Sequence, residues 1–227
     1  MGNLVRSGSP APMAGREISG AVVPFDLNDI APVSWKNGGG TTREIACWPI
    51  NSNIETFDWR ISVARIDRNG PFSTFSGVDR VITLLDGAGV TLLDENGTSH
   101  ALTQPLKPHA FDGEASIYGE LIAGSSEDLN IMVRRGRIHA SVSVLDDAAS
   151  LPVAGAGMLL AVGACWHLHA SDGTPYTLAP GQGVWWGGQP TAWSVHFGTT
   201  SAAATSRGLI AIALHDIRAP GALGDTI

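Results

Sequence analysis

Cysteine is scarce in this sequence of 227 residues, and so are lysine and long apolar runs. The two cysteines, Cys47 and Cys165, lie too far apart to suggest a disulfide framework, so we expect free thiols in a reducing compartment. The first 20 residues lack the continuous apolar stretch of a signal peptide, and no later run reaches the length of a membrane span. These absences predict a cytoplasmic protein with no membrane contact and a flexible leader over residues 1–20.

Positive charge is also sparse, which argues against nucleic acid as a partner. The net charge is -7 at pH 7, and the 14 basic residues are spread along the chain without a basic tract. Apolar residues make up 44% of the sequence, enough for a sizeable core in one large domain or two small ones. We therefore expect a globular protein that does not bind nucleic acid.

Short apolar runs separated by turn residues dominate the sequence, and almost no segment has helical periodicity. The run over residues 57–66 alternates cleanly, with Phe57, Trp59, Ile61 and Val63 on one side and Asp58, Arg60, Ser62 and Ala64 on the other. Asn96-Gly97 predicts a hairpin between two further runs, at 90–93 and 101–106. Such regular short strands predict an all-β fold of the sandwich or barrel type.

From Ser141 onward the charge nearly vanishes, although the rhythm of strands and turns continues. We predict two small antiparallel β-barrels packed together, the first over residues 21–140 and the second over 141–227, with the chain free to cross between them. Four aromatic residues of the second half either form the interface of a homodimer or are buried against the first barrel. They are Trp185, Trp186, Trp193 and Phe197.

The stretch from Trp35 to Ile45 combines an indole ring, a cation, an amide and three consecutive glycines just before a predicted strand. Glycine costs backbone entropy, so a chain keeps it where φ is positive or where another group approaches the main chain. Successive N–H groups there can form an anion cradle. The alternative is a tight loop that leaves Lys36 in solvent.

Several segments together resemble the HutD (Ves-like) family. In order along residues 25–140 they are Trp35–Ala46, Phe57–Ala64 followed by Gly70–Ser73, Asp79-Arg80, Phe111–Glu114 and Asp128–Gly136. The resemblance implies a bicupin, with two cupin-like barrels in one chain, and a role in bacterial histidine utilisation. It further implies binding of a pathway metabolite that limits flux, without established catalysis and without a cofactor.

Histidine breakdown passes through urocanate and formylated or formimino derivatives of glutamate, so a pocket for these small carboxylates needs cations. An arginine fork holds a carboxylate with two charge-assisted hydrogen bonds. We expect the first barrel to bind such a metabolite through Trp35, Lys36, Asn37, Gly38, Thr41, Arg60, Ser62, Arg80, Asn130 and Arg134. Arg60 is the strongest candidate, because its strand aims it at a defined place.

Each of these residues also has a plainer interpretation. Arg60 can pair with Asp58 or Glu44 on a solvated sheet face, and Arg134 and Arg135 can pair with Asp128 or Glu127. Trp35 can stack on a planar ligand or simply plug the barrel.

The alternative function is a metal-dependent cupin enzyme, an isomerase or a dioxygenase, with a metal near His167 and His169. Spacing of i and i+2 puts both imidazoles on one face of a strand. However, only Asp172 follows where the pattern has Glu, and His196 or His215 would complete the site only if the fold brought them near. The incomplete pattern favours a packed or exposed histidine pair, and no nucleophile or phosphate-binding motif is present.

Overall fold

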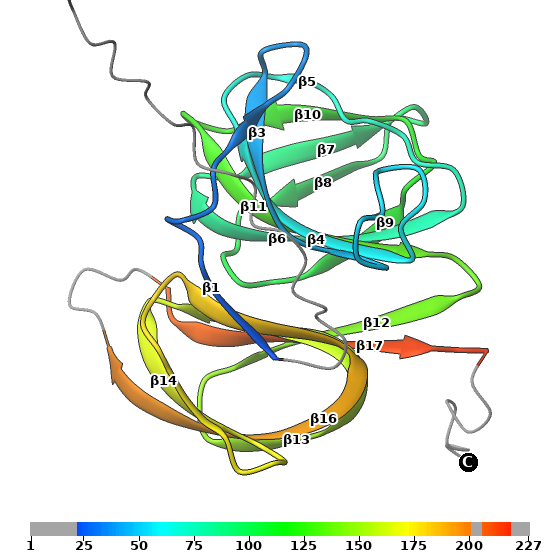
Figure 1. Ribbon diagram of the computed structural model, residues 1–227. Helices are drawn as coiled ribbons and strands as arrows, with labels where there is room; N and C mark the ends of the chain where they lie inside the picture. The colour runs from blue at the N-terminus through cyan, green and yellow to red at the C-terminus, as the bar shows by residue number, and fades with distance from the viewer. Residues whose placement is uncertain (1–21, 201–205, 219–227) are drawn as a thin grey trace, which may run out of the picture.

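Seventeen β-strands and no α-helix make up the described part of the chain (Figure 1). The computed structural model describes residues 22–200 and 206–218. The expected leader over residues 1–20 lies outside them. Within these two ranges there is no helix long and apolar enough to cross a membrane. The all-β, antiparallel fold predicted from the strand rhythm is confirmed.

A six-stranded antiparallel sheet, the middle sheet, runs through the centre of the molecule. Its order is β2 (Val33–Ser34), β3 (Gly40–Trp48), β4 (Trp59–Ile66), β11 (Ser126–Arg134), β6 (Val78–Gly87) and β9 (His109–Asp112). In β4 the predicted alternation is confirmed, because Trp59, Ile61 and Val63 are all buried in one apolar core.

A four-stranded sheet, the small sheet, packs on one face of the middle sheet through a core that both sheets share. Its order is β5 (Gly70–Pro71), β10 (Ile117–Leu121), β7 (Val90–Asp94) and β8 (Ser99–Leu102). The predicted hairpin is confirmed between β7 and β8, although β8 ends at Leu102. Gly97 adopts φ 81° in its turn, a value that suits glycine because it has no Cβ.

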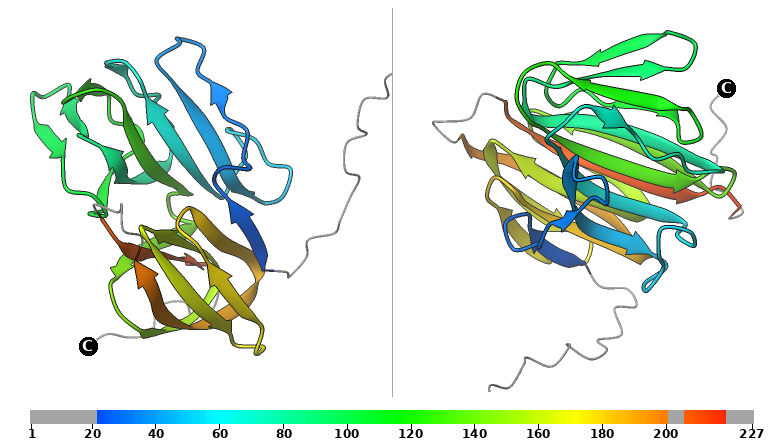
Figure 2. Two further views of the ribbon diagram at one scale, coloured as in Figure 1. Left: turned by 90° about the vertical axis from the view of Figure 1, so that its left-hand side faces the viewer. Right: turned by 90° about the horizontal axis from the view of Figure 1, so that it is seen from above.

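The other face of the middle sheet packs on a seven-stranded antiparallel sheet, the C-terminal sheet, which curves round its own second core (Figures 1 and 2). Along its main path the order is β12 (Ile138–Leu145), β17 (Gly208–Asp216), β13 (Ala149–Val162), β16 (Gln182–Thr200), β14 (Ala164–Ala170) and β15 (Pro175–Leu178), and β1 (Val23–Asp26) also pairs with β16.

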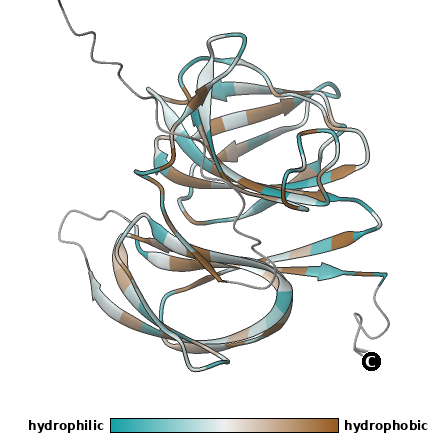
Figure 3. Ribbon diagram, in the orientation of Figure 1, coloured by the Kyte–Doolittle hydropathy of each residue, from teal (hydrophilic) through white to brown (hydrophobic). Residues whose placement is uncertain are grey.

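Strand β13 explains why the second half has so little charge. Met158 and Leu160 face the core against the middle sheet, whereas Leu159 and Ala161 face the inner core of the C-terminal sheet. Apolar residues are therefore consecutive in this part of β13, and the hydropathy of the chain can be followed in Figure 3. A strand buried on both faces reads as a continuous apolar run rather than an alternating one.

The aromatic residues of the second half are largely internal. Trp185 is buried in the core against the middle sheet, and Trp186 and Trp193 are buried inside the C-terminal sheet. Phe197 is half-buried and packs edge-on against Trp166 of the same inner core. Burial against the first half, one of the two predicted roles, is therefore observed for Trp185, whereas Trp186, Trp193 and Phe197 pack within the C-terminal sheet. The homodimer interface stays a prediction.

The chain crosses between the two halves at both ends of the N-terminal part. Strand β1, although early in sequence, pairs with β16, and Figure 2 shows it running into the C-terminal sheet. Strand β12 begins at Ile138 and pairs with β17. Phe111 and Asp112 lie in strand β9, and β16 is one long strand from Gln182 to Thr200.

Candidate functional site

A cavity of about 460 Å³ lies on the face of the middle sheet that is turned away from the C-terminal sheet. Its floor comes from β3, β4, β6 and β11, and its walls come from two loops. One, residues 34–37, runs from the last residue of β2 into the turn before β3, and the other, residues 71–75, begins at the last residue of the short strand β5. Alternation along β4 produces this floor, since Arg60, Ser62 and Ala64 face the cavity while their neighbours face the core.

Seven of the ten predicted ligand-binding residues line this single cavity: Trp35, Lys36, Asn37, Arg60, Ser62, Arg80 and Asn130. Gly38, Thr41 and Arg134 do not. Thr42 lines the cavity in place of Thr41, because adjacent residues of a strand point to opposite faces. The guanidinium of Arg134 turns away and donates to the carbonyl oxygens of Ser76, Glu55 and Phe57.

The three glycines do not form the predicted anion cradle. The N–H of Gly38 donates to the carbonyl of Trp35, and the N–H of Gly39 donates to the side-chain oxygen of Asn37. Gly38 has φ 67°, and a Cβ on Gly40 would overlap the carbonyl oxygen of Arg65. The glycines therefore allow a tight turn and close packing of β3 on β4, which shapes the wall that carries Trp35.

Arg80 is the most unusual residue of the cavity. Its side chain is only 7% exposed, and its guanidinium carbon lies 5.6, 5.5 and 4.8 Å from the ring centres of Phe72, Phe75 and Phe111. Nε and one terminal nitrogen donate to Oδ1 of Asn130 at 3.2 and 3.0 Å, and the other terminal nitrogen donates to the carbonyl of Ser73 at 3.3 Å.

None of these partners of Arg80 carries a charge. Among residues 22–200 and 206–218, no carboxylate pairs with this guanidinium. Burial lowers the pKa of Arg80 to about 10, and repulsion from Arg60 contributes as a second cause. The cavity thus holds a buried cation that is solvated only by neutral oxygen atoms and aromatic rings.

Arg60 reaches the cavity from β4 but already has a carboxylate partner. Its Nε lies 2.6 Å from Oε2 of Glu44, and a terminal nitrogen donates to the hydroxyl of Ser62 at 3.3 Å. The plainer interpretation of Arg60 as half of an ion pair thus holds together with its place in the cavity. Asp58, the other expected partner, pairs with Arg137 instead.

Trp35 forms part of the wall through a specific contact, because its indole N–H donates to the hydroxyl of Thr42 at 2.8 Å. The ring also packs against the core between the middle and small sheets. Lys36 follows it as an exposed side chain at the rim. Thus the loop offers the cavity one hydrogen-bonded ring and one exposed amine.

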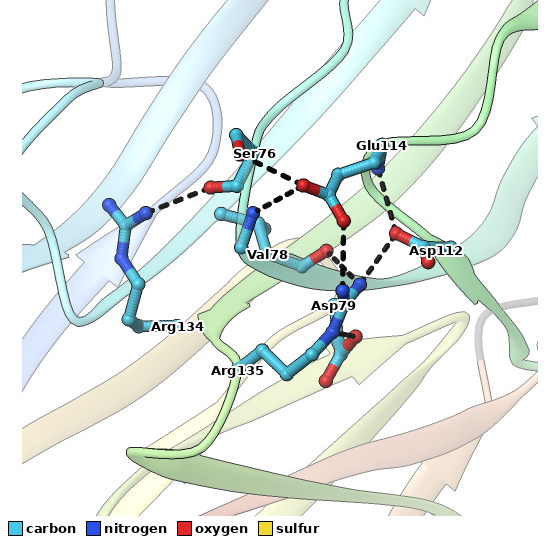
Figure 4. Close-up of polar contacts among 8 residues, drawn as sticks. Ser76, Val78, Asp79, Asp112, Glu114, Arg134 and Arg135 are labelled. Carbon is cyan, nitrogen blue, oxygen red and sulfur yellow. Dashed lines mark hydrogen bonds and ion pairs between the residues drawn. The ribbon is translucent and has the colours of Figure 1, made fainter.

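The carboxylates predicted to pair with Arg134 and Arg135 lie elsewhere. Asp128 is fully buried, accepts a hydrogen bond from Ser126 on Oδ2, and has no partner on Oδ1. Burial raises its pKa to about 7, with repulsion from Glu127 as a smaller cause. Glu127 pairs with Arg43 and Arg65. Arg135 pairs instead with Asp79, Asp112 and Glu114 (Figure 4).

Several cavity residues were not predicted, and half of them lie in the loop after β5 or on β6 and β11. Those in these places are Phe72, Ser73, Phe75, Ile82 and Met132, and the others are Ser34, Thr42, Ala64, Ile66 and Pro71. The family-like segment Gly70–Ser73 was a usable signal for the first two. Nothing in the local sequence indicates that Phe75 and Phe111 approach Arg80, because their proximity depends on the fold.

The two candidate metal ligands lie far from this cavity, in β14 of the C-terminal sheet. His167 and His169 are exposed. Trp166, which precedes them, and Leu168, which lies between them, are buried inside the sheet. Nδ1 of His167 lies 3.2 Å from the hydroxyl of Thr177, and the rings of His169 and His196 are 6.3 Å apart. Within the described ranges, no three His, Cys, Asp or Glu side chains are arranged to hold a metal ion.

Comparison with known proteins gives consistent results. The HutD family profile matches residues 27–205. Protein Ves of Cronobacter sakazakii is 39% identical over 163 residues, which are 71% of this chain and 85% of that protein. The structure of HutD from Pseudomonas fluorescens SBW25 is 28% identical with a TM-score of 0.71, covering 86% of this chain and 98% of that one. A conserved protein of unknown function from Pseudomonas aeruginosa PAO1 shares the fold, with a TM-score of 0.73, 24% identity and the same coverage of 86% and 98%.

Proposed function

Because the chain belongs to the HutD family, we propose that it is a cytoplasmic small-molecule binding protein of bacterial histidine utilisation whose cavity takes a carboxylate metabolite. The observation that carries this proposal is Arg80, a buried cation without a carboxylate partner in the described chain. Binding, rather than catalysis, is the activity proposed.

The electrostatics of the cavity support an anionic ligand. Arg60, Arg80 and Lys36 line it, and no Asp or Glu in the described part of the chain does. Burying an unpaired charge is costly, and a carboxylate that entered would relieve this cost at Arg80 through strong, charge-assisted hydrogen bonds. Since Glu44 already neutralises Arg60, Arg80 is the stronger anchor of the two.

Neutral groups around Arg80 support a ligand with further polar atoms. Ser62 and Asn130 lie on the floor beside the two arginines, and Asn37 lies on the loop wall. These groups suit the formyl or amide oxygen of formylglutamate, whereas the Trp35 ring suits a flat ligand such as urocanate. We propose one of these two metabolites as the ligand, and regulation of pathway flux as the result of its binding.

We also propose how the sheets are assigned to barrels. The middle and small sheets enclose one core and the C-terminal sheet curves round another, which supports an assignment as two cupin-like barrels in one chain. In that assignment the ligand belongs to the first barrel, and the exposed pair His167 and His169 belongs to the second.

A thermal-shift titration tests the proposal. A ligand that binds only the folded protein at 100 times its Kd adds about 2.7 kcal/mol to the free energy of unfolding, so formylglutamate or urocanate should raise the Tm. Arg80→Met should remove the shift, whereas Arg218→Met, a control at an exposed ion pair with Asp216, should keep it. Absence of any shift with millimolar formylglutamate, urocanate or formiminoglutamate would refute the proposal.

A further inference from the structure

Arg135 lies outside the cavity and gathers three carboxylates round one guanidinium (Figure 4). Its Nε lies 2.8 Å from Asp79, and its two terminal nitrogens lie 2.5 Å from Asp112 and 2.9 Å from Glu114. One of these nitrogens also donates to the carbonyl of Val78 at 3.3 Å. Since the side chains are 40–52% exposed, the cluster lies at the surface.

Glu114 connects this cluster to the segment Phe72–Gly77. While Oε2 meets Arg135, Oε1 accepts hydrogen bonds from the hydroxyl of Ser76 at 2.8 Å and from the N–H of Gly77 at 3.1 Å. The backbone reinforces the connection, because the N–H of Phe75 donates to the carbonyl of Gly113 at 2.7 Å. The turn that contains Glu114 therefore holds the C-terminal end of the segment.

The opposite side of the same segment forms the cavity wall. Phe72, Ser73 and Phe75 line the cavity, the two rings flank the guanidinium of Arg80, and the carbonyl of Ser73 accepts a hydrogen bond from it. A continuous series of contacts thus leads from Arg135 through Glu114 and the segment to the buried cation. The charged residues of the cluster and its neighbours belong to the family-like segments at residues 79–80, 111–114 and 134–135. Most charged side chains of these segments do not line the cavity.

We propose that Arg135 is a positioning residue of the carboxylate cavity: through Glu114 it fixes the segment Phe72–Gly77, and so sets the ring positions round Arg80. The part of this inference that concerns ligand affinity rests on the proposed function. The part that concerns the segment does not.

The charge balance of the cluster explains why one residue has this role. Three carboxylates meet a single guanidinium, so removing it leaves three like charges close together without compensation. Glu114, exposed and repelled by Asp112, would then turn to solvent and release Ser76 and Gly77. Isolated surface ion pairs contribute little, but several pairs that share one Arg fork form a network with defined geometry.

Other contacts limit the expected effect to the segment itself. Arg134 donates to the carbonyl of Ser76, and the N–H of Phe72 donates to the carbonyl of Ile117, so the segment stays attached when Arg135 is lost. We therefore expect Arg135→Met to fold and to bind its ligand about five- to tenfold more weakly, since a looser wall must be ordered on binding.

The experiment compares four proteins: wild type, Arg135→Met, Arg135→Lys and the control Arg218→Met, which removes an exposed, ion-paired arginine just after β17. Amide hydrogen exchange is followed at Phe75 and Gly77, and affinity for formylglutamate and urocanate is measured by calorimetry. We expect faster exchange and weaker binding in Arg135→Met, partial recovery in Arg135→Lys, and neither change in Arg218→Met.

Unchanged exchange at Phe75 and Gly77 in Arg135→Met would overturn the inference, and so would faster exchange with unaltered affinity. If the wild type binds neither metabolite, the proposed function fails, and exchange alone then decides whether Arg135 fixes the segment. Exchange in β13, which is remote from the cluster, separates local loosening from a general loss of stability.

Discussion

Arg80 and Asn130 face one another from the neighbouring strands β6 and β11, and two nitrogens of the guanidinium donate to the same oxygen, Oδ1 of Asn130. A carboxylate at this position would neutralise the cation within the protein, whereas an amide satisfies its hydrogen bonds and leaves its charge unbalanced. Asn rather than Asp at position 130 therefore keeps the cavity positively charged. Replacing this one residue is the most direct test of the role of that charge.

Asn130→Asp should give Arg80 an internal carboxylate of nearly the same shape. We expect a higher Tm without ligand, because the buried charge becomes paired, and affinity for formylglutamate or urocanate at least about tenfold lower. Calorimetric titration and thermal denaturation of the same samples measure both effects. Stronger binding in this variant would contradict the role given to Arg80.

Glu44 and Arg60 should change affinity in opposite directions. Their ion pair, 2.6 Å between Nε and Oε2, reduces the charge that Arg60 offers to a ligand. Arg60→Ala should therefore weaken carboxylate binding without unfolding the protein, and Glu44→Gln should strengthen it about threefold or more by freeing the cation. Since Glu44 is about half exposed, Glu44→Gln should change the Tm little. Equal effects of the two substitutions would show that the pair acts only structurally.

Much of the cavity floor could be predicted from sequence, because strand alternation is a local property. The pattern of residues 57–66 was enough to separate Arg60 and Ser62 from Trp59 and Ile61. For Thr41 in β3 no such pattern was available, since the sequence does not show in which register the strand leaves the glycine turn, and Thr42 lines the cavity instead. A bulge between Glu44 and Ala46 shifts the register again.

The arginines show a second limit. Arg80 and Arg134 both occur in family-like segments, but only Arg80 is surrounded by Phe72, Phe75 and Phe111, which come from separate parts of the chain. Likewise, the pairing of β1 with β16 joins residues about 160 positions apart. Such long-range contacts follow from the packing of the whole fold, and a local pattern does not contain them.

The glycine stretch provides a prediction about the cavity wall. A Cβ on Gly40 would overlap the carbonyl oxygen of Arg65 and lie 3.1 Å from the Trp35 ring, so Gly40→Ala should cost about 1–3 kcal/mol and weaken ligand binding. Gly38→Ala is the matched control: it meets no neighbour within 4 Å, and only its φ of 67° costs about 1–2 kcal/mol. Urea denaturation and calorimetry should therefore show a loss of affinity for Gly40→Ala beyond that of Gly38→Ala. Equal affinity in the two variants would show that the wall carrying Trp35 does not contribute to ligand binding.

Asp128 makes stability depend on pH in a direction opposite to that of most acidic residues. Burial raises its folded-state pKa from 3.8 to about 7, so the folded state binds a proton more tightly than the unfolded state does. The stability linked to this proton is fully present below about pH 4 and is lost as the pH rises through 7.

Asn at position 128 imitates the protonated carboxyl and carries no charge at any pH. The difference in free energy of unfolding between Asp128→Asn and wild type should therefore grow from pH 4 to pH 8, by about 4 kcal/mol at most. Taking the difference cancels the contributions of other acidic residues, such as Asp112 and Glu114. The pKa of Asp112 is lowered by a hydrogen bond from the backbone of Glu114 and by Arg135, and the pKa of Glu114 is lowered by hydrogen bonds from Ser76 and the backbone of Gly77 and by Arg135. Urea denaturation across this range measures the difference. A value that stays constant with pH would mean that Asp128 is charged in the folded protein throughout, with a partner that the present contacts do not include.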